Sequence, residues 1–170
     1  MVMGAHYVLT ASIHENVVSN WNWIEALIAS VPIAILVMLI VWINQFQDAP
    51  SDAAVGKNTW VVRTAEQGEW MKLEKPLRLY KQFMIEAFVA VALVGALSFF
   101  TDFGTVYAFM ALIPLALVWK AFKMADEWMI KWNNPNADRQ KVPYELLLVN
   151  VSTIGIHFLT GILLAVAYIL

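Results

Sequence analysis

The 170-residue sequence contains no cysteine and few charged residues, and both shortages restrict what the protein is. Without cysteine, the chain has neither a thiol nucleophile nor a disulfide. Charged residues make up 14% of the chain and hydrophobic residues 61%, whereas soluble domains contain about 25% charged residues. This composition excludes an ordinary soluble domain and indicates an integral membrane protein. The net charge of −2 says little about partners, and we expect no nucleic acid among them.

Four apolar segments are long enough, or nearly so, to cross a bilayer, which takes about 20 residues of helix. A fifth apolar segment, at the N-terminus, is too short to cross. We therefore predict an all-α transmembrane helix bundle in a single domain, residues 1–170, with four full spans and a partial N-terminal helix. The four spans and the short segment are Trp23–Phe46, Leu79–Phe100, Val106–Phe122, Leu146–Leu170 and Met1–Ala11.

The positive charges are confined to two parts of the chain. All 11 lysines and arginines lie in Lys57–Lys81 and Lys120–Lys141, each between two predicted spans. The other two connections contain Glu15 and Asp102 and neither lysine nor arginine. By the positive-inside rule, both basic segments face the cytoplasm. We predict an integral protein of the cytoplasmic membrane, surrounded by lipid bilayer, with both basic segments on the cytoplasmic face.

Some residues in and beside the spans are unusual for a membrane helix. Pro32 and Pro114 fall inside spans, where proline kinks a helix. Glu86 also lies well inside a span. Because intramembrane carboxylates are costly and tend to face the bundle interior, Glu86 either faces a substrate or makes a structural hydrogen bond. The amphipathic stretch Trp119–Trp128 is expected to lie at the interface as a cap over the bundle.

Two carboxylates, Asp48 and Asp52, lie four residues apart where the first span gives way to polar residues. The C-terminal carbonyls of a helix carry roughly half a negative charge, so two carboxylates there are repulsive unless a cation shares the site. Magnesium takes one or two protein carboxylates and completes its octahedron with water and phosphate oxygens, and a nearby Lys or Arg binds other oxygens of the same phosphate. With Lys57 and Arg63 following, this stretch suggests magnesium-dependent handling of a diphosphate at the membrane surface.

The same residues also fit a simpler interpretation. Pro50 disfavours helical geometry at Ala49, so Asp48 would N-cap a short surface helix that begins near Pro50. Asp52 would then be a solvated residue in the first turn of that helix. Asn44, one turn before Asp48, either reaches the same site or caps a helix end. The spacing D-x-x-x-D alone does not decide between these interpretations.

The stretch Trp42–Arg63 resembles the second aspartate-rich motif of the UbiA-type transmembrane prenyltransferases. In that family an apolar helix ends in Asn and is followed by D-x-x-x-D, by Gly-Lys-Arg-Thr and by a short apolar run with Arg. The flanks are similar too: Met3–Thr10 looks like the end of the fifth helix of the family, and Asn134–Arg139 with Leu159–Ala165 looks like its ninth. The residues that match the motif are Asn44, Asp48, Asp52, Gly56, Lys57, Thr59 and Arg63.

The resemblance covers essentially the whole chain but only the C-terminal half of the family fold, since the first aspartate-rich motif is absent. It implies Mg²⁺-dependent transfer of a polyprenyl group from a polyprenyl diphosphate to an aromatic acceptor. The most similar branch is the one that prenylates 1,4-dihydroxy-2-naphthoate in quinone synthesis. Asp48 and Asp52 would be the catalytic pair and the metal ligands, and Lys57, Arg63 and Asn44 would bind the diphosphate. A missing N-terminal half would be a partner.

A non-enzymatic function fits the sequence as well. The chain would then be a membrane subunit or remnant whose loop from Asp48 to Arg63 binds lipid phosphates without turnover. Lys-rich segments at the membrane surface attract anionic lipid whatever their chemistry.

Overall fold

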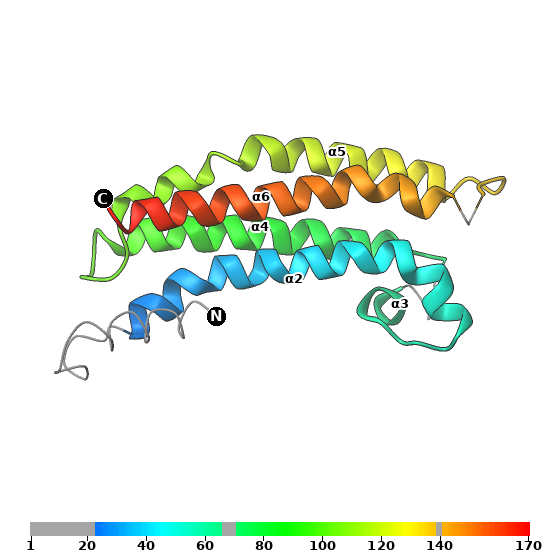
Figure 1. Ribbon diagram of the computed structural model, residues 1–170, viewed down its shortest axis with the longest axis horizontal. Helices are drawn as coiled ribbons and strands as arrows, with labels where there is room; N and C mark the ends of the chain where they lie inside the picture. Colours follow the sequence, from blue (N-terminus) through cyan, green and yellow to red (C-terminus); the bar gives the residue numbers. More distant parts are fainter. Residues whose placement is uncertain (1–22, 66–70, 139–140) are drawn as a thin grey trace.

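The computed structural model describes residues 23–65, 71–138 and 141–170, and within these ranges the chain forms helices and no strand. Four long helical units run up and down beside one another (Figure 1). Each is long and apolar enough to cross a membrane, which confirms the prediction of an all-α transmembrane bundle with four spans. The predicted partial helix at Met1–Ala11 lies outside the described residues. The elements are α2 (Trp23–Ala54), α3 (Trp60–Thr64), α4 (Glu74–Leu97), η2 (Val106–Leu112), α5 (Leu115–Trp132), η3 (Val142–Leu146) and α6 (Leu147–Ala167).

Helix α2 is a single helix of 32 residues that passes through both of its prolines. At 1.5 Å per residue it is about 48 Å long, whereas the hydrocarbon core of a bilayer is about 30 Å thick. A helix of this length exceeds the hydrocarbon thickness, and its last turns carry the polar residues Gln45, Gln47 and Asp48, which favour the aqueous side. The interpretation that Asp48 caps a new helix near Pro50 is wrong, because the helix is continuous there. Ala49 is fully buried in the main core, and this packing outweighs the preference of the residue before a proline for extended geometry.

The third span is kinked and longer than expected. The 3₁₀-helix η2 ends at Leu112 and α5 begins after Pro114, as expected from a residue that lacks an N–H group. Helix α5 then continues without interruption to Trp132. The expectation that Trp119–Trp128 lies as a cap at the interface is wrong, because this stretch is part of α5 and buries Ala121, Ala125 and Trp128 along one side.

The described connections that follow α2 and α5, with most of the described lysines and arginines, lie at one end of the bundle, which we call the basic end (right in Figure 1). Lys120 and Lys123 lie farther back along α5. The indole N–H of Trp132, at the end of α5, donates to the carbonyl of Met71, 2.8 Å away. The side-chain amide of Asn133 donates to the carboxylate of Glu74 at 2.9 Å. These contacts join the two segments directly, although they are far apart in the sequence.

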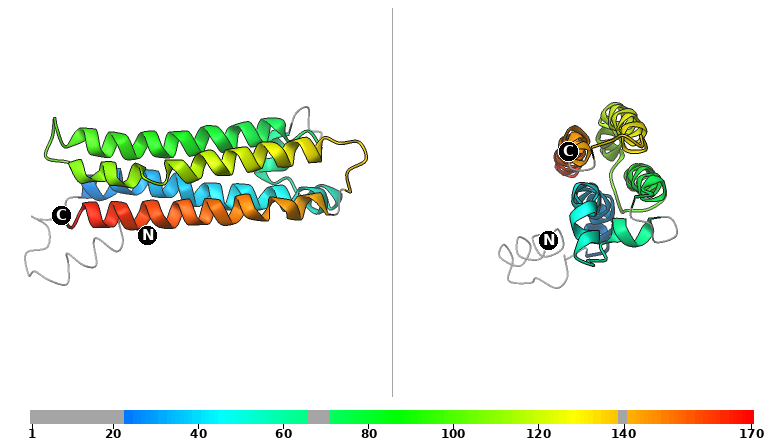
Figure 2. Two further views of the ribbon diagram at one scale, coloured as in Figure 1. Left: turned by 90° about the horizontal axis from the view of Figure 1, so that it is seen from above. Right: turned by 90° about the vertical axis from the view of Figure 1, so that its right-hand side faces the viewer.

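A smaller apolar cluster lies around Val91 and Leu164. The main apolar core includes residues of all four long units, which the end-on view of Figure 2 shows side by side. Near its middle the hydroxyl groups of Tyr80 on α4 and Thr153 on α6 form a buried hydrogen bond of 2.7 Å. Towards the basic end Phe46 of α2 packs edge-on against Trp128 of α5, with ring centroids 5.9 Å apart. The C-terminal turns of α2 are thus anchored on the core while their outer side is left to solvent.

Candidate functional site

Helix α2 ends in a turn that brings Lys57 back over Asp52. Gly56 has a left-handed backbone with φ of 70°, a conformation that glycine adopts without steric cost. Its N–H donates to Ala53 at 3.1 Å and the N–H of Lys57 donates to the carbonyl of Asp52 at 2.8 Å, the pattern of a Schellman motif. The Nζ of Lys57 then donates to Oδ1 of Asp52 at 2.9 Å.

Asp52 is a buried carboxylate with one oxygen unpaired. Only 7% of the residue is exposed, and its Oδ2 atom has no hydrogen-bond partner in the described part of the chain. An unpartnered buried carboxylate oxygen is costly, and it is the kind of ligand that a hard cation such as Mg²⁺ binds. Asp52 therefore fits the metal ligand expected from the sequence, although Lys57 already shares its other oxygen.

Asp48 and Asn44 lie along the same side of α2 as Asp52, since the three recur at every fourth residue. Asp48 is exposed, and its carboxylate makes neither an ion pair nor a hydrogen bond with any described residue. Asn44 does not cap a helix end, because α2 continues well past it. Its side-chain oxygen accepts a hydrogen bond from the amide of Asn150 on α6.

Arg63 stands apart from the two carboxylates. It lies on the short helix α3, which α2 holds in place because the N–H of Val61 donates to the side-chain oxygen of Gln45 at 3.2 Å. The Arg63 side chain is exposed and contacts neither Asp48 nor Asp52. Of the two cations expected at the site, Lys57 is the one that contacts a carboxylate among the described residues.

Sequence reasoning missed two amides at this end of the bundle. Asn150 is buried, and its Oδ1 has no partner in the described ranges; the same holds for Nε2 of Gln47 on α2. With Asp52 they account for three of the five buried, unpartnered side-chain atoms found in those ranges. An asparagine near the start of an otherwise apolar span was the available signal, because polar residues in spans usually have a partner or a function.

Glu86 does not face the interior of the bundle. It is exposed on the outer side of α4 and accepts a hydrogen bond of 2.8 Å from the side-chain amide of Gln82, one turn earlier. Of the two alternatives for Glu86, the structure shows the hydrogen bond, and a role toward a substrate stays a prediction. Helix α4 directs Ala87 and Phe88 inward instead.

Aromatic side chains pack together around Trp42, farther back along α2 than the two carboxylates. The ring of Trp42 meets those of Trp60 and Phe83 edge-on, each at a centroid distance of 5.8 Å. A pocket of about 400 Å³ does exist in the described part of the bundle, but it lies at the opposite end, between the start of α2 and the end of α6. No group of three or more His, Cys, Asp or Glu residues converges among the described residues, so Asp48 and Asp52 would act as a pair.

The chain was compared with models of known protein families, with curated proteins and with solved structures. None of them matches it. The resemblance to the UbiA-type prenyltransferases stays a prediction, and the residues at the basic end carry the functional argument.

Proposed function

We propose that the basic end of α2 binds a polyprenyl diphosphate together with Mg²⁺, and that the protein serves prenyl transfer to an aromatic acceptor. The observation that carries this proposal is the unpartnered, buried Oδ2 of Asp52. A second carboxylate, Asp48, lies one turn away, and a lysine ammonium lies 2.9 Å from the other oxygen of Asp52. Such a combination suits a ligand that brings a divalent cation and phosphate oxygens at the same time.

The residues have distinct roles in this proposal. Asp52 and Asp48 hold the metal ion. The Lys57 side chain is 63% exposed, and its ammonium has three donors, so it can contact a phosphate oxygen while it still bonds to Asp52. Arg63 reaches the diphosphate from α3. Asn44 acts by holding α2 to α6 through Asn150, below the carboxylates.

Prenyl transfer breaks the allylic C–O bond, whose electron pair leaves with the diphosphate. A carbon of the electron-rich ring forms the new C–C bond, and the ring then loses its proton. When bound, Mg²⁺ compensates the charge of the leaving diphosphate. The chain contributes by fixing the diphosphate where α2 leaves the hydrocarbon, so that the apolar tail of the donor stays in the membrane.

The proposed enzyme needs a membrane-protein partner in addition to this chain. Asp48 is exposed at the surface of the described bundle. An isoprenoid chain beside Asp48 would therefore have to be enclosed from outside. A partner with further spanning helices, such as the N-terminal half implied by the resemblance, would complete the cavity and supply additional ligands for the diphosphate.

A second function is favoured by the ion pair itself. Lys57 already neutralises Asp52, and both Lys57 and Arg63 are exposed, beyond the apolar part of α2. A non-catalytic subunit that binds lipid phosphates needs these cations but no metal ion.

Binding measurements separate the two functions. Farnesyl diphosphate is titrated into the purified chain in lipid nanodiscs, with and without Mg²⁺. We expect binding that requires Mg²⁺ and that falls about tenfold in Asp48→Asn and in Asp52→Asn. The double variant should be little worse than either single variant, because ligands of one ion are coupled. Asp126→Asn is the matched control, since this exposed carboxylate pairs with Lys81 at the same end.

A different binding pattern would exclude the Mg²⁺-dependent function. Binding that is independent of Mg²⁺, survives both Asn substitutions and is lost in Lys57→Ala would exclude the metal site. If phosphatidic acid in the nanodisc also competes for that binding, the lipid-phosphate function is the correct one.

A further inference from the structure

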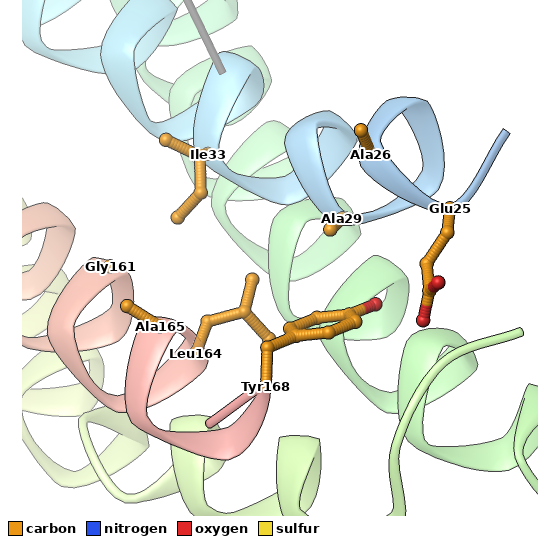
Figure 3. A pocket seen from close by; sticks show the side chains of 8 residues that line it. All are labelled: Glu25, Ala26, Ala29, Ile33, Gly161, Leu164, Ala165 and Tyr168. Carbon is orange, nitrogen blue, oxygen red and sulfur yellow. The ribbon is translucent and has the colours of Figure 1, made fainter. Parts of the chain in front are cut away.

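A pocket of about 400 Å³ opens between α2 and α6 at the end of the bundle remote from Asp52 (Figure 3). Its volume lies in the range of about 300–1,000 Å³ that is common for small-molecule sites. Apolar and mostly small residues form its walls, and Glu25 and Tyr168 provide the polar groups. The apolar lining consists of Ala26, Ala29, Ile33, Gly161, Leu164 and Ala165.

The pocket exists because α2 and α6 diverge. They are close where Ile33 meets Gly161, since a Cβ atom on this glycine would lie 3.8 Å from Cδ1 of Ile33. Pro32 lies beside this contact, and proline bends a helix because it removes one backbone hydrogen bond. In Figure 1 the first turns of α2 slope away from the end of α6. The small side chains there leave the gap open.

The hydroxyl group of Tyr168 lies at the pocket and is available as a hydrogen-bond donor. Its hydroxyl oxygen is buried and has no hydrogen-bond partner among the described residues. Burial and then the negative charge of Glu25 raise the pKa of Tyr168 to about 12, so the phenol keeps its proton. In Figure 3 this hydroxyl and the carboxylate of Glu25 point toward each other from the two helices.

We propose that this pocket binds the head of a long-chain alcohol, whose single hydroxyl accepts from Tyr168 and donates to Glu25. A hydroxyl is the smallest group that donates and accepts at once. Carboxylate and phosphate heads fit less well, because the described residues that line the pocket include no cation to balance their charge. The assignment is independent of the diphosphate proposal, because it uses other residues at the other end of the bundle.

The pocket runs from the membrane surface into the apolar part of the bundle, which suits an amphiphilic ligand. Glu25 lies at the start of one apolar span and Tyr168 directly follows the end of another, so both belong to the membrane surface. Ile33 lies about 12 Å deeper along α2, at 1.5 Å per residue. An alcohol with its hydroxyl at Glu25 and Tyr168 would therefore lay its alkyl chain along Ala29 and Gly161, parallel to the lipid chains.

Photolabelling tests the assignment. A 12-carbon primary alcohol with a diazirine in its chain is irradiated with the purified chain in nanodiscs, and labelled peptides are mapped by mass spectrometry. We expect saturable labelling around Ala29 and Gly161 that unlabelled dodecanol displaces. Tyr168→Phe should lower the labelling about fivefold, as expected for the loss of one hydrogen bond. Tyr107→Phe is the control, since Tyr107 is exposed on η2.

Two further comparisons make the result decisive. Ala29→Leu should fill the pocket and abolish saturable labelling, whereas the same change at the exposed Ala116 should not. The methyl ether of the probe accepts but does not donate, so it should label several-fold less than the alcohol. Equal labelling by alcohol and ether, stronger labelling by the corresponding amine, or unchanged labelling of Tyr168→Phe would each overturn the proposal. Labelling that does not saturate would mean bulk lipid in the groove and would overturn it too.

Discussion

Two glycines with left-handed backbones, one at the end of α2 and one in the connection before η2, provide a sharp test of the role of backbone conformation in this chain. Gly56 has φ of 70° and Gly104 has φ of 82°. Alanine in this conformation costs about 1–2 kcal/mol. At Gly56 this is the whole cost, because a Cβ there would meet no atom within 4 Å. At Gly104 a Cβ would lie 2.3 Å from the carbonyl oxygen of Val94, so the backbone of α4 or the loop must move.

The expected order of stability follows from these distances. Gly56→Ala should lower the free energy of unfolding by about 1–2 kcal/mol. Gly104→Ala adds the clash with a buried helix, and its total cost should be about 2–5 kcal/mol. Unfolding by sodium dodecyl sulfate in mixed micelles, followed by tryptophan fluorescence, measures both. Equal unfolding midpoints for the two variants would refute the reasoning.

Gly56 should also affect the proposed function, whereas Gly104 should not. The turn at Gly56 carries Lys57 over Asp52, so Gly56→Ala should weaken Mg²⁺-dependent binding of farnesyl diphosphate. Gly56→Asn should restore most of the binding, because asparagine tolerates the left-handed conformation better than alanine. If asparagine is as damaging as alanine at this position, the turn does not act through its backbone conformation.

Three further predictions concern the bundle as a whole. Single cysteines introduced at Lys72 and Lys131 should react with an impermeant thiol reagent from the same side of the membrane, because contacts join the two basic segments; reaction from opposite sides would contradict the fold. Glu86→Leu should keep or raise stability in nanodiscs, because a carboxylate exposed in mid-span is costly in lipid; a clear loss of stability would mean that this face is covered. Tyr80→Phe should cost about 0.5–1.5 kcal/mol by removing one buried hydrogen bond to Thr153, and an unchanged unfolding midpoint would show that the bond contributes nothing.

The candidate site was only partly predictable from the sequence. The motif from Asn44 to Arg63 directed attention to the C-terminal end of α2, because a carboxylate pair after an apolar run is conspicuous in any chain. The ion pair between Lys57 and Asp52 depends on the φ angle of Gly56, and the separation of Arg63 depends on how α3 packs on Gln45. The spacing of residues along the chain predicts neither the ion pair nor the position of Arg63.

The sequence by itself determined that the chain is a bundle of four membrane-spanning units, because about 20 apolar residues in a row have no other stable place than lipid. Only the tertiary structure decided where helices end and which way polar side chains point. Helix α2 passes Pro50 because Ala49 is buried in the core, and Glu86 turns outward because Ala87 and Phe88 take the inner side of α4. Hydropathy depends on a local segment alone, whereas helix ends and side-chain directions depend on contacts between residues far apart in the chain.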